Sequence, residues 1–160
     1  MLLISDDGRV LLQQRSTLKT RFAGRWANTC CGHPAPGQSV TDAARIRLTE
    51  EMGLSGIPLR EIGHFTYRAI DDATGRVEHE YDHVLIGHTS GTPTPNPDPA
   101  EISTWAWVPI TTLRRALCIT PDKYAPWLAA VIALACPPHP PELVASSISA
   151  AQAMSRPHPR

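Results

Sequence analysis

A cysteine and a histidine two positions apart, Cys31 and His33, are the first residues of the chain whose types and spacing could do chemistry. In an extended segment alternate side chains point the same way, so the Cys31 thiol and the His33 imidazole share one face and Cys30 points away from it. A structural cysteine beside a histidine in a turn is an equally good interpretation, because free cysteines are often small apolar core residues. The spacing alone leaves both open.

Two glutamates, Glu78 and Glu80, flank His79 in a segment with strand character. On a strand these carboxylates lie on one face and repel each other, and burying both is costly without a cation or a proton. A divalent metal ion with oxygen ligands would resolve the conflict, and His33 could add a nitrogen ligand. His79 and His83 should face away from the two glutamates. The alternative is an exposed strand face, where charged pairs usually lie.

Basic residues are concentrated between a predicted strand and Trp26, namely Arg15, Lys19, Arg21 and Arg25. In a chain without net charge they predict a local anion site, with a solvated loop as the alternative. Arg47 and Glu51 are four residues apart on a predicted helix and could form an ordinary surface pair. Trp127 begins an apolar helix and is typical of a core, although its ring could stabilise a cation by roughly 0.5–2 kcal/mol.

The elements that must position these residues follow from hydrophobic alternation and turn signals. A hairpin is predicted with strands over 1–5 and 10–15 and a turn at Gly8, followed by a short strand over 26–31. Ser39 and Gly53 bound a helix over 40–52 as its N-cap and C-cap. The later predictions are strands over 61–70, 76–88 and 104–108, a loop over 92–99, and helices over 111–117 and 125–136 with Pro126 in the first turn of the second. Together they predict an α+β fold.

Length and composition restrict the classes of protein. The 160 residues suit one domain, and we assign residues 1–136 to it and the Pro-, Ser- and Ala-rich residues 137–160 to a flexible tail. Fifteen basic and fifteen acidic residues cancel, which argues against partners such as nucleic acid or a membrane surface. No apolar stretch approaches the ~20 residues that span a bilayer. With no signal peptide visible and four cysteines lacking CxxC spacing, we expect a cytoplasmic protein.

Five segments in a fixed order carry a resemblance to a known family: GRWANTCCGHP over 24–34, TEEMG over 49–53, FTYRA over 65–69, EHE over 78–80 and YAPW over 124–127. In this order they resemble the type 1 isopentenyl diphosphate isomerases of the Nudix superfamily, over about residues 2 to 130. The resemblance implies a Nudix-like α/β/α sandwich with a mixed central sheet. It also implies conversion of isopentenyl diphosphate to dimethylallyl diphosphate in isoprenoid biosynthesis.

The resemblance assigns catalytic roles to three residues. Cys31 resembles the catalytic thiol, Glu80 the acid/base on the opposite side of the substrate, and Tyr67 the hydroxyl that hydrogen-bonds this glutamate. Moving a double bond by one carbon requires one proton added and another removed nearby, through a tertiary carbocation that water would trap. Trp127 resembles the aromatic residue beside the reacting alkene, where an indole lowers the energy of a cation without attacking it.

The resemblance also assigns binding roles. Arg15, Lys19 and Arg47 match positions that hold phosphate oxygens. Glu51 matches the residue that helps to hold Mg²⁺ against the diphosphate. A second divalent metal ion, Mg²⁺, Mn²⁺ or Zn²⁺, is expected on the residues that resemble metal ligands, His33, Glu78 and Glu80. The expected partner is a small-molecule diphosphate, and the expected oligomeric state is a monomer or weak homodimer.

The chain departs from the family in ways that leave two alternatives open. The family places two further metal-binding histidines upstream of its first matched strand, and this chain starts inside that strand, so we expect either an upstream start or an impaired copy that only binds diphosphates. The other alternative is a Nudix hydrolase of a nucleoside diphosphate derivative. Against it, Gln38, Ile46 and Arg47 stand where the hydrolase motif has Glu, Arg and Glu.

Overall fold

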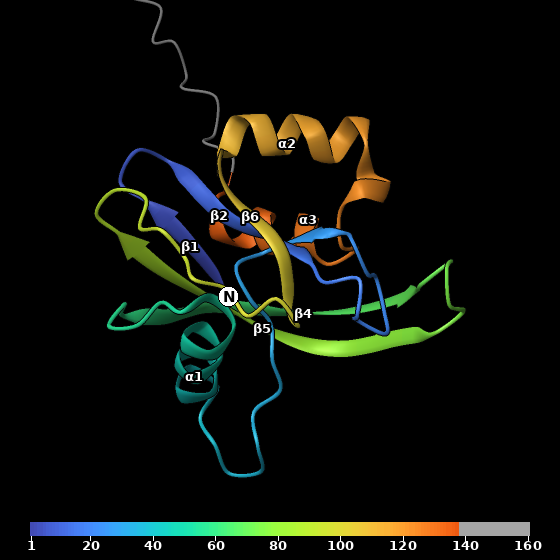
Figure 1. Ribbon diagram of the computed structural model, residues 1–160, viewed down its shortest axis with the longest axis horizontal. Coiled ribbons are helices and arrows are strands. Elements are labelled where there is room, and N and C mark those ends of the chain that lie inside the picture. Colours follow the sequence, from blue (N-terminus) through green and yellow to red (C-terminus); the bar gives the residue numbers. More distant parts are fainter. Residues whose placement is uncertain (138–160) are drawn as a thin grey trace, which may run out of the picture.

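The computed structural model describes residues 1–137, in which a six-stranded sheet lies between one helix on one face and two helices on the other (Figure 1). The predicted tail lies outside the described residues except for Pro137. The strands are β1 (Leu2–Ser5), β2 (Arg9–Arg15), β3 (Trp26–Ala27), β4 (Leu59–Ile70), β5 (Val77–Thr89) and β6 (Ile102–Pro109). The helices are α1 (Val40–Met52), α2 (Ile110–Ile119), the 3₁₀ turn η1 (Pro121–Lys123) and α3 (Leu128–Ala135).

The sheet is mixed. Strand β1 pairs in parallel with β5, and the other pairs are antiparallel, in the order β3-β2-β1-β5-β4. Strand β6 pairs with β2 along the whole length of β2, so β1 and β3 must share the other edge of that strand. The predicted α+β fold, a sandwich with a mixed central sheet, is confirmed.

Two hydrophobic cores cover the two faces of the sheet. Because side chains alternate along a strand, neighbouring residues enter different cores. Leu2 and Val84 belong to the core with α2 and α3, whereas Leu3 and Leu85 belong to the core with α1. This alternation explains how the short strand β1 can be buried on both faces, as central strands of α/β sandwiches are.

Helix α1 begins and ends where the sequence predicts. The Ser39 hydroxyl accepts a hydrogen bond from the Asp42 backbone N–H, and Gly53 ends the helix in the left-handed conformation at φ 65°. Both caps satisfy backbone groups that a helix terminus leaves unpaired. The helix therefore presents a fixed face, with Ala44, Leu48 and Met52 buried against the sheet.

Two predicted elements are shorter than expected. The strand predicted over 26–31 ends at Ala27, because the following residues bond outside the ladder: the Thr29 hydroxyl accepts from Leu3 N and donates to the Leu11 carbonyl. The helix predicted from Ala125 begins only at Leu128. A residue before proline is disfavoured in helical geometry, and the Ala125 N–H instead donates to the Trp26 carbonyl at 2.8 Å.

The remaining predicted elements are present, most of them with extended bounds. Four elements extend one or two residues beyond at least one predicted end, namely β4, β5, β6 and α2. Residues 92–99 lack regular structure, as predicted. Among the described residues, no helix has the length and apolar character needed to cross a bilayer.

Candidate active site

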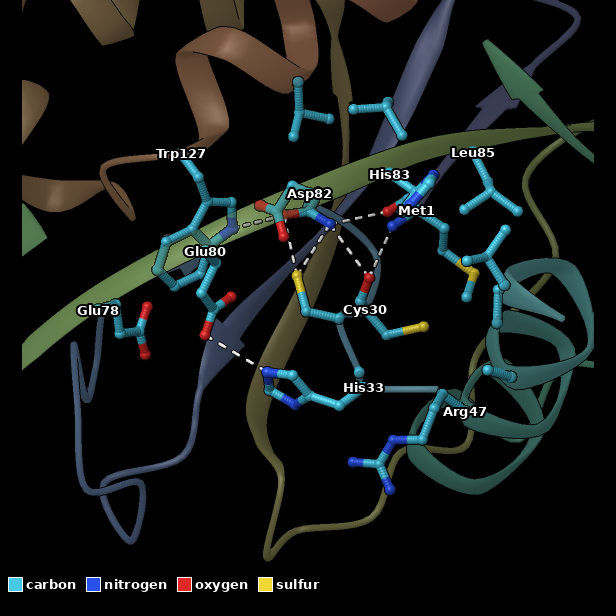
Figure 2. Close-up of a pocket in the computed structure, with 18 of the residues that line it drawn as sticks. Met1, Cys30, His33, Arg47, Glu78, Glu80, Asp82, His83, Leu85 and Trp127 are labelled. Carbon is cyan, nitrogen blue, oxygen red and sulfur yellow. Dashed lines mark hydrogen bonds and ion pairs between the residues drawn. The ribbon is translucent and has the colours of Figure 1, made fainter. Parts of the chain in front are cut away.

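A pocket of about 720 Å³ contains all but one of the predicted site residues. Its wall includes strand β5, the N-terminal half of α1, the segment over 28–34 and Trp127. Figure 2 shows Glu78, Glu80 and Asp82 along β5, Trp127 beside them, and Arg47 projecting from α1 at the other end. The predicted residues that line the pocket are Arg15, Lys19, Cys31, His33, Arg47, Tyr67, Glu78, Glu80 and Trp127. Glu51 does not line it.

The two glutamates of β5 share a single phenol. Tyr67 is paired with Glu80 in the β4–β5 register, and its hydroxyl lies 2.9 Å from Glu78 Oε2 and 3.4 Å from Glu80 Oε2. Burial raises the pKa of Tyr67, and the neighbouring carboxylates raise it further. The phenol therefore stays protonated and donates to this pair. The prediction that Glu78 and Glu80 lie on one face is confirmed.

The other contacts of the two glutamates differ. His33 Nε2 lies 3.3 Å from Glu80 Oε1, whereas Glu78 Oε1 lies 3.9 Å from Arg21 Nη1. Within residues 1–137, no three or more His, Cys, Asp or Glu side chains converge closely enough to hold a metal ion. The donor types suit a divalent metal, but the described residues do not bring His33, Glu78 and Glu80 to one point. The second metal site stays a prediction.

The two adjacent cysteines have different surroundings. Cys30 is fully buried in the α1-side core, whereas Cys31 packs at the margin of the other core and faces the pocket. Burial raises the pKa of the Cys31 thiol, while a hydrogen bond from the Asn28 amide at 3.2 Å acts in the opposite direction. At neutral pH the thiol is therefore protonated and able to donate a proton.

Trp127 forms part of the apolar wall. It is 3% exposed, its ring centroid lies 5.6 Å from those of Phe22 and Tyr67, and its indole N–H donates to Asn28 Oδ1 at 2.9 Å. The Arg15 guanidinium lies 5.4 Å from the ring centroid. This distance lies within the range of a cation–π contact.

A basic cluster formed by Arg15, Lys19 and Arg47 lines the pocket. Lys19 is ion-paired with Glu101, and burial lowers its pKa. Arg47 has a buried Nε that no hydrogen-bond partner within the described part of the chain satisfies. A buried unsatisfied donor is costly, so an anion that accepts from this N–H would bind favourably.

Glu51 lies beside this cluster but outside the pocket wall. Its Oε1 lies 2.5 Å from Arg47 Nη2, and the residue is only 3% exposed, so this is not the ordinary surface pair that the spacing allows. Burial raises the pKa of Glu51 even though Arg47 and Lys19 oppose the shift. The structure does not bring Glu51 together with His33, Glu78 and Glu80, and a role in holding Mg²⁺ stays a prediction.

Three pocket or near-pocket residues were missed by sequence reasoning. Asp82 continues the alternation of Glu78 and Glu80 along β5, a signal that could have found it; burial raises its pKa, as does Glu80. Asn28 and Glu101 offered no such signal. Asn28 contacts Trp127, 99 residues away, and Glu101 contacts Lys19, 82 residues away, so only the tertiary fold reveals them.

Comparison with protein families gives one family match. Residues 1–133 match the NUDIX domain. The chain is 58% identical to an isopentenyl-diphosphate Delta-isomerase of Nocardia farcinica over 135 residues, which cover 84% of this chain and 75% of that protein. It is 46% identical to the protein of the same name from Halorhodospira halophila, over 78% of this chain and 70% of that one.

Comparison with solved structures gives the fold alone. A protein from Deinococcus radiodurans superposes with a TM-score of 0.67 at 17% identity, over 83% of this chain and 78% of that one. A MutT protein from Methanosarcina mazei superposes with a TM-score of 0.59 at 15% identity, over 81% and 84% of the two chains. This chain therefore shares its fold with proteins that have little sequence identity to it.

Proposed function

Because this chain belongs to the isopentenyl-diphosphate Delta-isomerase family of NUDIX-domain proteins, we propose that it converts isopentenyl diphosphate to dimethylallyl diphosphate. The observation that supports this best is a single pocket that holds the Cys31 thiol, the Glu80 carboxylate and the basic cluster. A proton-transfer pair and an anion-binding end are what this substrate requires. Its hydrocarbon part offers no polar group to hold.

The proton transfers are assigned to Cys31 and Glu80. One group adds a proton to the terminal methylene carbon of the alkene, and the other removes a proton from the carbon two positions along, so the double bond shifts and no proton is gained overall. The raised pKa of Cys31 means that this thiol enters the reaction protonated. The Tyr67 hydroxyl, 3.4 Å from Glu80 Oε2, keeps this carboxylate oriented.

The intermediate cation needs a dry and electron-rich surrounding. Trp127, packed against Phe22 and Tyr67, supplies an aromatic face that cannot act as a nucleophile. The Arg15 guanidinium occupies the vicinity of this face in the structure. We propose that the diphosphate draws Arg15 toward its own oxygens, which leaves the indole free for the hydrocarbon.

The diphosphate is assigned to Arg15, Lys19 and Arg47. The unsatisfied Nε of Arg47 supports this, since a phosphate oxygen would complete its hydrogen bonding. Binding energy at this end holds the small hydrocarbon in register with the proton-transfer pair. A divalent metal ion, expected from the family, would add charge neutralisation at the diphosphate.

Hydrolysis of nucleotide derivatives is less supported. A Nudix hydrolase needs several free carboxylates on the helix that corresponds to α1, to hold metal ions and activate water. Here Arg47 pairs with the two acids that this chain keeps from the hydrolase motif. Its Nη1 lies 3.1 Å from Glu50 Oε2 and its Nη2 lies 2.5 Å from Glu51 Oε1. Two ion-paired carboxylates are fewer than the hydrolase motif uses, and Cys31 would have no function in hydrolysis.

The proposal is tested by incubating the full chain with isopentenyl diphosphate and Mg²⁺ in D₂O and following the product by NMR. We expect dimethylallyl diphosphate that carries deuterium, without release of phosphate. Turnover of nucleoside diphosphate derivatives with phosphate release, and none of the alkene, would instead identify a hydrolase. Binding of isopentenyl diphosphate without turnover would identify a protein that only binds diphosphates.

Cys31→Ala tests the assigned thiol. The variant should lose isomerisation by at least about 1,000-fold, because one of the two proton-transfer groups is gone. Its urea unfolding midpoint should stay close to that of the wild type, because the thiol lies at the margin of the core. Near-normal turnover in Cys31→Ala would refute the assignment. The adjacent Cys30→Ala serves as the matched control, expected to lose stability and to keep turnover.

A further inference from the structure

We infer that Asn28 is a positioning residue of this pocket, whose side-chain amide fixes the Cys31 thiol relative to the Trp127 indole. The consequence for turnover rests on the proposed function, but the positioning itself does not. The residue is 1% exposed and lines the pocket, where it contacts both Cys31 and Trp127.

The contacts of Asn28 use both ends of its amide. Oδ1 accepts the Trp127 indole N–H at 2.9 Å. Nδ2 donates to the Met1 carbonyl at 2.9 Å, to the Cys30 carbonyl at 3.1 Å and to Cys31 Sγ at 3.2 Å. One planar group therefore connects the side chains of Cys31 and Trp127, which are 96 residues apart in sequence.

The amide can adopt only one orientation. Two backbone carbonyls need a donor, and the indole N–H needs an acceptor, so a flipped amide would lose all three hydrogen bonds. The two hydrogens of Nδ2 serve three acceptors, so one hydrogen is shared between two of them, and the Cys31 thiol in turn lies 3.5 Å from Oδ1, to which it can donate. A buried amide satisfied in this way resists rotation, because any other rotamer leaves polar groups unpaired.

Neither functional side chain has another group to fix it in this manner. Within residues 1–137, Asn28 is the one side chain or backbone group that hydrogen-bonds the Cys31 thiol. Trp127 also packs against Phe22, Tyr67 and Arg15, but these ring contacts are not directional in the way that the hydrogen bond of its indole N–H is. The proton donor and the cation-facing ring must meet the same carbon skeleton, and a displacement of about 1 Å can cost a factor of about 100 in rate.

The first test uses the indole N–H resonances of the four tryptophans in a ¹H–¹⁵N spectrum of the full chain. Trp127→Phe assigns the resonance of Trp127. In Asn28→Ala this resonance should move upfield and its exchange with water should accelerate, because the acceptor is gone. Asn28→Asp keeps an acceptor for the indole but loses the amide donors, so it should leave the resonance near its place. An unmoved resonance in Asn28→Ala would overturn the inference.

The second test is kinetic, with isopentenyl diphosphate as the probe. Asn28→Ala and Asn28→Asp should both lower kcat by about 10- to 100-fold while KM changes by less than about 3-fold, because the diphosphate end is untouched. Thr29→Val is the matched control: Thr29 is 0% exposed and bonds Leu3 and Leu11. It should lose stability but keep kcat within about 3-fold.

The outcomes separate this inference from the proposed function. An equal loss of kcat in Thr29→Val, or normal kcat in both Asn28 variants, would overturn the positioning role. If the wild-type chain does not isomerise the substrate, the proposed function fails while the resonance shift still tests the link between Asn28 and Trp127. If Asn28→Ala does not fold, Asn28→Asp carries the kinetic test.

Discussion

At the scale of single residues, the absence of a side chain at position 32 leaves room for the Arg47 side chain in the pocket. A Cβ on Gly32 would lie 2.7 Å from Cγ of Arg47 and 3.2 Å from both Cδ and Nε. Real Cβ atoms do not approach other atoms so closely, so the guanidinium must shift if this glycine is replaced. The residue beside the proposed catalytic thiol thereby sets the path of a side chain that we propose to bind phosphate.

Gly32→Ala should therefore weaken substrate binding more than chemistry. We expect KM for isopentenyl diphosphate to rise by about 10-fold, with kcat within about 3-fold, because Arg47 is displaced and Cys31 is not. Arg47→Ala supplies the control: in that background the added Gly32→Ala should have little further effect on KM. Additive losses in the double variant would show that Gly32 acts on something other than Arg47.

Trp127→Leu separates the stabilisation of the cation from the binding of the diphosphate. The variant should lower kcat by more than it raises KM, since the aromatic face is lost and the basic cluster remains. Trp127→Phe keeps an aromatic ring and should lose less. A rise in KM alone would contradict the assignment. Both variants are compared with the wild type at a temperature well below unfolding, because truncating a buried tryptophan costs about 3–5 kcal/mol.

Sequence reasoning reached those site residues that local geometry determines. The period of two along a strand predicts that Glu78 and Glu80 lie together, and it predicts the separate surroundings of Cys30 and Cys31. It could not reach Asn28, because this residue is defined by its contact with Trp127 on a different element. Arg15, Lys19 and Arg47 were predicted as binding residues from the family resemblance, because their charge alone is equally compatible with a solvated loop.

At the scale of elements, the β4–β5 hairpin is held at its tip. The Asp71 side chain accepts hydrogen bonds from the Phe22 backbone N–H at 3.1 Å and from the Thr74 hydroxyl at 2.8 Å. Asp71 is 3% exposed. This carboxylate therefore joins the turn of the hairpin to the segment between β2 and β3, which carries Lys19 and packs Phe22 against Trp127.

The pKa of Asp71 makes this contact dependent on pH. Burial acts to raise the pKa, but hydrogen bonds from Thr74, Phe22 and Ala73 outweigh it and hold the pKa below its ordinary value of 3.8. A carboxylate whose pKa is lower in the folded state stabilises the fold above the unfolded pKa. Its contribution disappears as the pH falls through the folded pKa.

Asp71→Asn should therefore lower the free energy of unfolding by about 1–3 kcal/mol at pH 7, through loss of charge-assisted hydrogen bonds. The difference from the wild type should begin to shrink as the pH falls below the ordinary carboxyl pKa of 3.8, and should go on shrinking toward the lower pKa of the folded state, where the native carboxylate also becomes neutral. Urea unfolding at pH 7 and pH 3 measures this. Asp72→Asn, at the exposed neighbouring position, is the control and should change little. A difference that does not depend on pH would contradict the explanation.

Element boundaries were predictable where the determinants are local. Helix α1 was predicted to the residue because Ser39 and Gly53 cap it within the segment itself. The start of α3 was wrong by three residues, because Pro126 disfavours helical geometry at Ala125, whose N–H instead pairs with Trp26. The strand over 26–31 was too long because the Thr29 hydroxyl bonds Leu3 and Leu11, and the Asn28 amide bonds Met1 and Trp127, all outside the β2–β3 ladder.

At the scale of the whole molecule, both cores and the pocket are built from residues 1–136. We propose that these residues form one isomerase domain. A chain that ends after Pro137 should keep its thermal midpoint within a few degrees and its kcat within about 2-fold, because no described contact is removed. Differential scanning calorimetry and the D₂O assay check this. A large loss in either would assign residues 138–160 to the domain.

The same truncated chain allows the oligomeric state to be measured. The expectation of a monomer or weak homodimer stays a prediction, and sedimentation at several protein concentrations tests it. Every predicted catalytic residue lies on one chain and lines one pocket. Turnover per chain should therefore stay constant on dilution.

Strand β5 carries acids on one side and His79, Tyr81 and His83 on the other, and a few residues later it feeds Val84 and Leu85 into opposite cores. Inserting or deleting one amino acid between Glu80 and Val84 would exchange the two faces of the strand on one side of the change. Either the acidic side chains would then point away from the pocket, or Val84 and Leu85 would each face the wrong core. Evolution can therefore alter the length of this stretch only in steps of two, or by adding a compensating bulge. In homologous proteins, the number of residues between the positions of Glu80 and Val84 should therefore stay odd even where the amino acids differ.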